Sequence, residues 1–187
     1  LRVPEKAEAA GAAGWLTRLR AAIVREEATL LVVNKPPGLA VHGGSGVNVG
    51  LIETLRAMYD TDRYLELVHR LDRDTSGLLL VARRASTLRS LHGLLRSNGV
   101  DKRYLCLVSG RWPAHLKRVD APLEKFALPS GERRVKVAAT GRQSLTTFRV
   151  VTRWPSMTLV EAKPVTGRTH QIRVHCQHAG FPILGDA

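Results

Sequence analysis

The sequence predicts an α+β fold, in which a mixed, largely antiparallel β-sheet is flanked by helices. Short β-branched or apolar runs recur along the chain and end at turn residues rich in Pro and Gly, as strands do. Helical spacing of apolar residues occurs in only a few segments, and it does not alternate regularly with the strands as in βαβ units. The 187 residues are enough for one sizeable core.

The first half of the chain contains three strand signals and two helix signals. Strands are expected over residues 23–34, 64–69 and 78–82, and the last of these reads as fully buried. Helices are expected over residues 51–58 and 85–98, each with apolar residues spaced to form one core-facing side.

The second half is richer in strands. One is expected over residues 104–109, and residues 144–152 and 157–163 are expected to form an antiparallel pair. Residues 114–142 are expected to form a loop-rich basic hairpin region, and residues 169–179 a last helix.

The charge of the chain is strongly positive and unevenly spread. The formal net charge is +13, and residues 100–153 alone carry 12 basic and 4 acidic side chains. A segment this basic predicts a polyanionic partner, with nucleic acid favoured over an anionic membrane; a merely basic soluble protein is the alternative. No apolar run approaches the roughly 20 residues of a membrane span.

The segment His69-Arg70-Leu71-Asp72-Arg73-Asp74-Thr75-Ser76-Gly77 is the densest cluster of charge beside a predicted strand. If residues 66–72 are extended, Arg70 and Asp72 share one face about 7 Å apart, and the guanidinium lowers the pKa of the carboxyl. An ionised carboxylate can act as nucleophile or base. Glycoside hydrolysis needs a second carboxyl group, which the pattern does not provide. A solvated salt-bridge cluster is the other interpretation.

Two further patterns suggest cofactor sites and fail. His170, His175 and His178 crowd the last helix, but His170 and His175 point about 140° apart on a helix, and two ligands do not make a zinc site. The glycines of residues 43–46 lack the Lys-Ser/Thr of a phosphate-binding loop. We interpret these glycines as a flexible loop near the bound nucleic acid. We therefore expect no metal and no cofactor.

Four segments in one order resemble the RluA-type pseudouridine synthases. His69-Arg70-Leu71-Asp72 with Thr75-Ser76-Gly77 resembles their second motif. Asn34-Lys35-Pro36-Pro37-Gly38 with Val41-His42 resembles the first motif, and Lys102-Arg103-Tyr104-Leu105 resembles the Lys-x-Tyr element. Residues 167–175 and 180–186 resemble the third motif. Residues 41–46 and 88–92 are most similar to the RluC-like large-subunit ribosomal RNA enzymes.

The resemblance covers residues 23–187 and implies a fold, a reaction and a partner. The implied fold is a bisected sheet with the active-site cleft at its middle. The implied reaction converts specific uridines of 23S ribosomal RNA to pseudouridine by base flipping and an essential aspartate, without a cofactor. The same chemistry on another RNA, such as transfer RNA, stays open, as does an inactive RNA-binding module.

The resemblance also implies roles for individual residues. Asp72 matches the essential aspartate, as nucleophile at C1′ or as base. Tyr104 matches the tyrosine that stacks on the target base, and a core tyrosine is the alternative. Arg173 matches an arginine that pairs with the aspartate; alternatively, it caps its helix or pairs with Asp186. The residues expected to support the site and extrude the base are Arg70, His69 and Ile172.

Contacts to RNA phosphates are expected from basic and polar side chains. The set comprises Lys102, Arg103, Arg168, Gln171, Lys117, Arg118, Arg133 and Arg134. For Arg168 and Gln171, a structural role at the start of the last helix is equally open.

The domain prediction places a linker at residues 1–20 and the catalytic domain at residues 21–187. The resemblance implies an S4-like RNA-binding domain before the linker and a closing segment after the catalytic domain. The chain begins with Leu1, so we expect a piece of a longer protein. Only two cysteines are present, which is typical of a reducing cytoplasm. A monomer is expected.

Overall fold

The computed structural model describes residues 12–43, 50–60, 64–131 and 133–186. The chain divides into two compact units, Leu1–Gly99 and Val100–Ala187, called here the N-terminal and C-terminal units.

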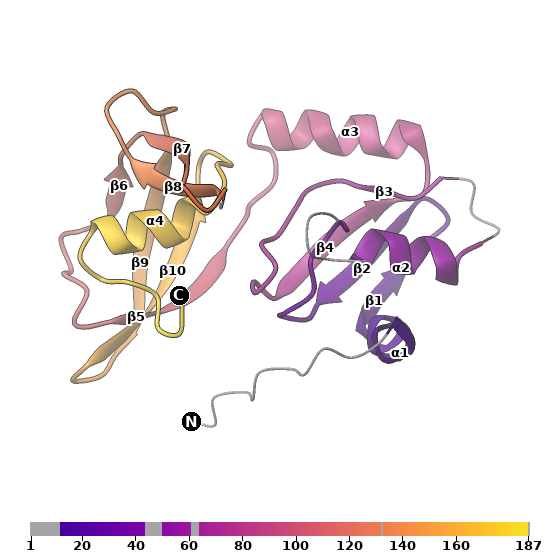
Figure 1. The fold of residues 1–187 in the computed structure, drawn as a ribbon, viewed down its shortest axis with the longest axis horizontal. Coiled ribbons are helices and arrows are strands. Elements are labelled where there is room, and N and C mark those ends of the chain that lie inside the picture. Colours follow the sequence, from indigo (N-terminus) through magenta and orange to yellow (C-terminus); the bar gives the residue numbers. More distant parts are fainter. Residues whose placement is uncertain (1–11, 44–49, 61–63, 132, 187) are drawn as a thin grey trace. The chain divides into compact units, whose positions relative to one another are not determined.

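In the described part of the N-terminal unit, the chain forms one antiparallel sheet and three helices (Figure 1). The sheet has the strand order β1-β2-β4-β3. Its elements are α1 (Ala12–Ala22), β1 (Ile23–Glu26), β2 (Leu30–Lys35), α2 (Leu51–Met58), β3 (Glu66–Leu67), β4 (Gly77–Ala82) and α3 (Ala85–Arg96).

The core of this unit forms on one face of the sheet. Alternate residues of β2, Leu31 and Val33, are buried, as period-two geometry requires, and so are Leu79 and Val81 of β4. Helix α1 contacts α2 and β2, and buries Leu19. The buried side chains of α2 complete this core; they are Leu51, Ile52, Thr54 and Leu55.

Several expectations for this unit need correction. Residues 12–20 of the expected linker form most of α1, because Leu19 is buried in the core. The strand expected over 64–69 reduces to β3, with two residues. Leu78 of β4 is 62% exposed, because only alternate side chains of that strand face the core. Helix α3 contains no buried residue, so its leucine side chains all stay partly exposed, contrary to the core-facing side expected from their spacing.

The C-terminal unit contains a four-stranded sheet, a two-stranded ribbon and one helix (Figure 1). The sheet order is β5-β10-β9-β6, and β7 pairs with β8. Its elements are β5 (Tyr104–Ser109), β6 (Arg118–Asp120), β7 (Leu123–Ala127), β8 (Arg133–Val137), β9 (Leu145–Arg153), β10 (Met157–Pro164) and α4 (Gln171–His178).

An aromatic cluster fills the core of the C-terminal unit. The ring of Trp112 lies 4.6 Å from that of Phe148 and 5.3 Å from that of Phe181, measured between centroids. Cys106 of β5 and Cys176 of α4 are both buried in this core as free thiols. Helix α4 contacts β8, β9 and β10, so its position is set by this core.

The α+β fold predicted from the sequence is confirmed, and all strand pairs within the described residues are antiparallel. The pair expected over 144–152 and 157–163 is β9 and β10, and the expected basic hairpin is β7 and β8. The last helix begins at Gln171, later than expected, because His170 is left-handed with φ 52°. In the described part of the chain, no helix is long and apolar enough to span a bilayer.

Candidate functional site

Asp72 lies at the start of a tight turn in the N-terminal unit. The backbone N–H of Thr75 donates to the carbonyl oxygen of Asp72 at 3.1 Å, which closes the turn. The side chain of Asp72 is half-buried, and those of Arg73 and Asp74 are exposed. The turn therefore directs the two outer charges to solvent and leaves Asp72 partly enclosed.

The buried ammonium group of Lys35 is hydrogen-bonded to the backbone of this turn. Its Nζ donates to the carbonyl oxygens of Pro36 at 2.9 Å, Leu39 at 2.9 Å and Arg73 at 2.8 Å. Burial lowers the pKa of Lys35 to about 8, and the carboxylates of Asp74 and Asp72 oppose that shift. Three acceptors match the three donors of a charged ammonium group. Lys35 thus joins the end of β2 to the Asp72 turn.

Sequence reasoning did not identify Lys35 as a site residue. A signal was present, since Lys35 follows Leu31 and Val33 in the period-two pattern of β2 and is therefore on the buried face. A buried lysine needs hydrogen-bond acceptors, and the carboxylates nearest to it indicate where the candidate site lies.

His69 anchors the other end of the turn segment to the edge of the sheet. Val68 N–H donates to the carbonyl oxygen of Leu80 at 2.9 Å, and Leu80 N–H donates to Nε2 of His69 at 3.2 Å. The imidazole thus accepts the bond that a further strand residue would have accepted. From α3, Nε2 of His92 donates to the carbonyl oxygen of Val68 at 3.1 Å. His69 therefore ties the segment that leads into the Asp72 turn to strand β4.

The sequence pattern predicts that Arg70 and Asp72 share one face of an extended strand, but residues 68–72 do not form a strand. Strand β3 ends at Leu67, and residues 68 and 69 bend away from the sheet. The bend arises because the His69 ring replaces the backbone in the ladder. Arg70 is exposed, whereas the cation buried near Asp72 is Lys35.

In the C-terminal unit, Gln171 starts helix α4 and is buried. Its Oε1 accepts from the Thr166 hydroxyl at 2.7 Å and from the Arg168 N–H at 3.0 Å. Its Nε2 donates to the carbonyl oxygen of Leu145 and to Oγ1 of Thr146, both at 3.0 Å. Gln171 thus has the structural role at the start of the helix that the sequence left open beside an RNA contact, and its amide is engaged inside the protein.

One turn later, His175 continues the same buried network. Its Nε2 lies 3.0 Å from the carbonyl oxygen of Ala121, which can only accept, so Nε2 carries the proton. Nδ1 then accepts from the Thr146 hydroxyl at 2.9 Å, and Ser144 Oγ lies 3.1 Å from Nε2. Burial is the main cause that lowers the pKa of His175, so the ring is neutral.

Between these two buried residues, Ile172 and Arg173 take different roles. Ile172, expected to support the site, packs against the aromatic core of its unit. The guanidinium of Arg173 contacts Asp186, with Nε 2.7 Å from Oδ2 and Nη2 2.6 Å from Oδ1. The Asp186 pairing that the sequence left open is therefore present.

Tyr104 is the first residue of β5 and is half-buried at the edge of the core, paired with Ala162 of β10. The C-terminal unit thus holds Tyr104 at a strand start and Arg168, Ile172 and Arg173 around the start of α4. Asp72, Arg70 and His69 belong to the N-terminal unit.

The basic side chains of the C-terminal unit differ in how far other charges neutralise them. Arg103 lies between two carboxylates, 2.7 Å from Asp101 and 3.5 Å from Glu161, and these raise its pKa. Like Arg103, the side chains of Lys117, Arg118, Arg133, Arg134 and Arg168 are exposed, and Lys102 is half-buried. Arg118 has one carboxylate nearby, that of Asp120 at 3.7 Å, whereas Arg103 has two.

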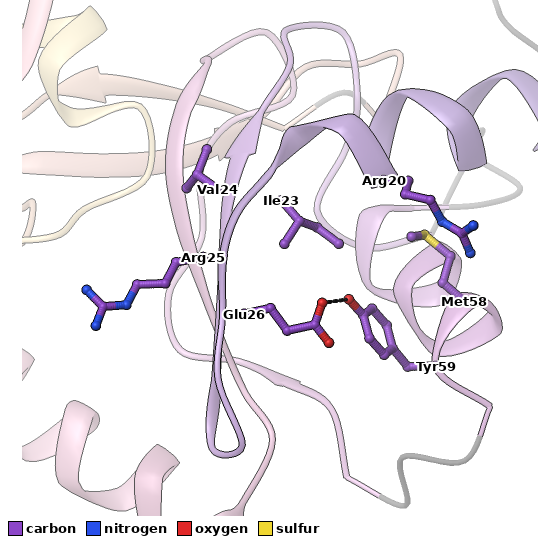
Figure 2. Close-up of a pocket in the computed structure, with 7 residues that line it drawn as sticks. All are labelled: Arg20, Ile23, Val24, Arg25, Glu26, Met58 and Tyr59. Atoms are coloured by element: carbon purple, nitrogen blue, oxygen red, sulfur yellow. Dashed lines mark hydrogen bonds between the residues drawn. The ribbon is translucent and has the colours of Figure 1, made fainter.

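A pocket of about 490 Å³ lies elsewhere in the N-terminal unit, between α1, β1 and the end of α2 (Figure 2). Inside it the hydroxyl of Tyr59 donates to the carboxylate of Glu26 at 2.7 Å, and Met58 lines the wall. The pocket contains none of the predicted site residues. Among the described residues, no group of three or more His, Cys, Asp or Glu side chains is placed to hold a metal ion.

Comparison with known proteins gives the family. The family model described as RNA pseudouridylate synthase matches residues 29–178. Ribosomal large subunit pseudouridine synthase C of Escherichia coli K12 is 58% identical over 164 residues, which cover 88% of this chain and 51% of that protein. The protein of the same name from Haemophilus ducreyi is 56% identical with the same coverage. The chain thus spans about half the length of the curated relatives it matches.

Solved structures agree with the sequence relatives. Human RNA pseudouridylate synthase domain containing 4 has a TM-score of 0.73 at 28% identity, covering 92% of this chain and 70% of that one. Human RNA pseudouridylate synthase domain containing 1 has a TM-score of 0.72 at 28% identity, covering 88% of this chain and 67% of that one. The predicted resemblance to the RluA-type and RluC-like enzymes is confirmed. The chain belongs to the RNA pseudouridylate synthase family.

Proposed function

We propose that this chain is the catalytic part of an enzyme that converts specific uridines of 23S ribosomal RNA into pseudouridine. The observation that carries the proposal is 58% identity with a protein named as a large-subunit ribosomal pseudouridine synthase. The construction of the Asp72 turn supports it, because a buried cation and a sheet-edge histidine fix the backbone on either side of Asp72.

Asp72 is the proposed catalytic carboxylate. The reaction breaks the bond between ribose C1′ and uracil N1, turns the uracil and joins C1′ to C5. C5 loses a proton, and N1 gains one. Asp72 serves either by attacking C1′ or by taking a ribose proton. Product and substrate have the same atoms and the same oxidation state, so the isomerisation requires no net oxidant or reductant.

The remaining roles involve both units. The uridine must leave the RNA stack, at a cost of a few kcal/mol, before a carboxylate can reach C1′. We propose that Arg70 helps to extrude the base, Tyr104 stacks on it, and Arg173 stabilises charge near Asp72. Since Asp72 and Arg70 belong to one unit and Tyr104 and Arg173 to the other, the proposal requires both units to act on one nucleotide.

The exposed basic side chains of the C-terminal unit are the proposed phosphate contacts. They are Lys117, Arg118, Arg133, Arg134 and Arg168. The enzyme is proposed to act as a monomer in the cytoplasm, where ribosomal RNA occurs. It is proposed to modify ribosomal rather than transfer RNA, because its curated relatives are named for the large ribosomal subunit.

The proposal is tested with RNA that carries tritium at uracil C5, since isomerisation releases that hydrogen to water. Asp72→Asn should abolish tritium release while RNA affinity stays within about twofold, because phosphate contacts dominate affinity. Asp74→Asn is the matched control, two residues away in the same turn and exposed, and it should retain most of the activity. Undiminished release by Asp72→Asn would overturn the assignment.

Two rival functions give different products. An inactive RNA-binding module would retain RNA and release no tritium even as wild type. A nucleosidase would liberate free base and reduce the RNA mass, whereas isomerisation leaves the mass unchanged. Mapping pseudouridines in ribosomal and transfer RNA from cells that lack the gene decides between the two RNA substrates.

A further inference from the structure

The pair formed by Arg173 and Asp186 has a defined, two-bond geometry. Nε of Arg173 lies 2.7 Å from Oδ2 of Asp186, and Nη2 lies 2.6 Å from Oδ1. The side chains are only 32% and 28% exposed. A bidentate pair of this kind fixes the guanidinium plane, which single-contact surface ion pairs do not.

Asp186 is itself fixed to the sheet. The segment before it bonds with β5 twice, through Ser109 N–H to the Pro182 carbonyl oxygen and through Leu184 N–H to the Leu107 carbonyl oxygen, both at 2.8 Å. Gly185 then turns the chain with a left-handed φ of 78°. The backbone that leads into Asp186 is therefore anchored to β5, the strand whose first residue is Tyr104.

Arg173 is anchored from the opposite side. It lies on α4 between Gln171 and His175, whose side chains bond to β9 and to Ala121 from inside the core. Backbone and guanidinium are thus held by different parts of the same unit.

We propose that Asp186 is a positioning residue for the reaction and acts through Arg173. By fixing the guanidinium before RNA binds, Asp186 removes the rotamer freedom that a long arginine side chain otherwise loses at the moment of reaction. This inference rests on the proposed function, in which Arg173 stabilises charge near Asp72.

The test is single-turnover tritium release by the full chain with excess enzyme over RNA labelled at uracil C5. Asp186→Asn keeps the size of the side chain but loses its charge. We expect the rate constant to fall about 10- to 100-fold, as for a misplaced catalytic group, while the RNA dissociation constant changes less than about twofold. Glu27→Gln is the matched control, because Glu27 engages Nε and Nη2 of Arg25 at 2.6 Å outside the site.

A double variant shows whether Asp186 acts through Arg173. If it does, Asp186→Asn combined with Arg173→Ala is no slower than Arg173→Ala alone. Losses that multiply would overturn the inference, and so would an unchanged rate with only a lower melting temperature. A wild type that releases no tritium would instead overturn the proposed function.

Discussion

The ammonium nitrogen of Lys35 lies 2.8 Å from the carbonyl oxygen of Arg73, the residue next to Asp72. The same carbonyl accepts the backbone N–H of Gly38 at 3.0 Å. Two donors from the segment after β2 therefore converge on the Asp72 turn. The first and second motifs of the chain are thus parts of one structural element, in which a buried lysine determines where the candidate catalytic carboxylate lies.

Replacing this lysine should slow catalysis more than it weakens RNA binding. Lys35→Met keeps approximately the length of the side chain but removes the ammonium donor from three carbonyl oxygens, of which that of Arg73 keeps only the bond from Gly38. Displacement of the turn by about 1 Å is expected to lower the rate constant of tritium release by on the order of 100-fold. RNA affinity, measured by filter binding, should change little, because Lys35 is buried and the proposed phosphate contacts lie in the other unit.

Lys125→Met controls for the loss of one positive charge, because Lys125 is exposed on β7. Its rate constant should equal that of the wild type. Equal losses in the two variants would show that charge, rather than the position of the Asp72 turn, is responsible.

The parts of the fold that the sequence predicted well are those decided by local patterns. Strands β9 and β10 lie close to their expected bounds, because β-branched residues alternate across a single turn. Helix α2 likewise follows from its spacing, with Leu51, Ile52 and Leu55 all buried. Asp72 itself stood out because charge that dense beside a strand is unusual.

The parts that could not be predicted depend on contacts between distant residues. The bend after β3 exists because the N–H of Leu80 donates to the His69 ring instead of to a backbone carbonyl oxygen. For Gln171 the sequence left an RNA contact and a structural role equally open, because its partners Leu145 and Thr146 lie about 25 residues away in the sequence and become neighbours only once the unit has folded. No local pattern reports such side-chain partners, so these roles required the structure.

The buried His175 network should make the protein sensitive to acid. Its Nδ1 accepts from Thr146, whose oxygen already accepts from Gln171, so a proton on Nδ1 would place two donors against one hydroxyl. Burial lowers the pKa of His175 below its ordinary 6.5, so the unfolded chain binds the proton first as the pH falls. The free energy of unfolding should therefore decrease below about pH 6.5, by at most about 1.4 kcal/mol per pH unit.

Urea unfolding between about pH 7.5 and about pH 5.5 measures this slope. His175→Gln should be less stable near neutral pH but should lose less stability on acidification. His115→Gln replaces an exposed histidine and should keep the wild-type slope. Equal slopes in all three proteins would contradict the assignment of the acid sensitivity to His175.

The exposed basic residues of the C-terminal unit should contribute to RNA affinity through counterion release. Lys117 lies just before β6 and Arg133 begins β8, and both side chains are exposed. The double variant Lys117→Ala/Arg133→Ala should bind RNA more weakly, and the slope of log affinity against log salt should become shallower by about 2 in total. The rate constant at saturating RNA should stay unchanged, because neither residue belongs to the proposed catalytic set.

Arg103 provides the contrast that separates phosphate contact from mere positive charge. It holds Asp101 at 2.7 Å and Glu161 at 3.5 Å, and Arg149 holds Glu161 from the neighbouring strand at 3.2 Å. Because its charge is already compensated, Arg103→Ala should change the salt slope by well under 1. Measured with the double variant across the same salt series, a full unit of change for Arg103→Ala would mean that RNA displaces these carboxylates. The phosphate contacts would then include the segment just before strand β5 as well as the β7–β8 ribbon.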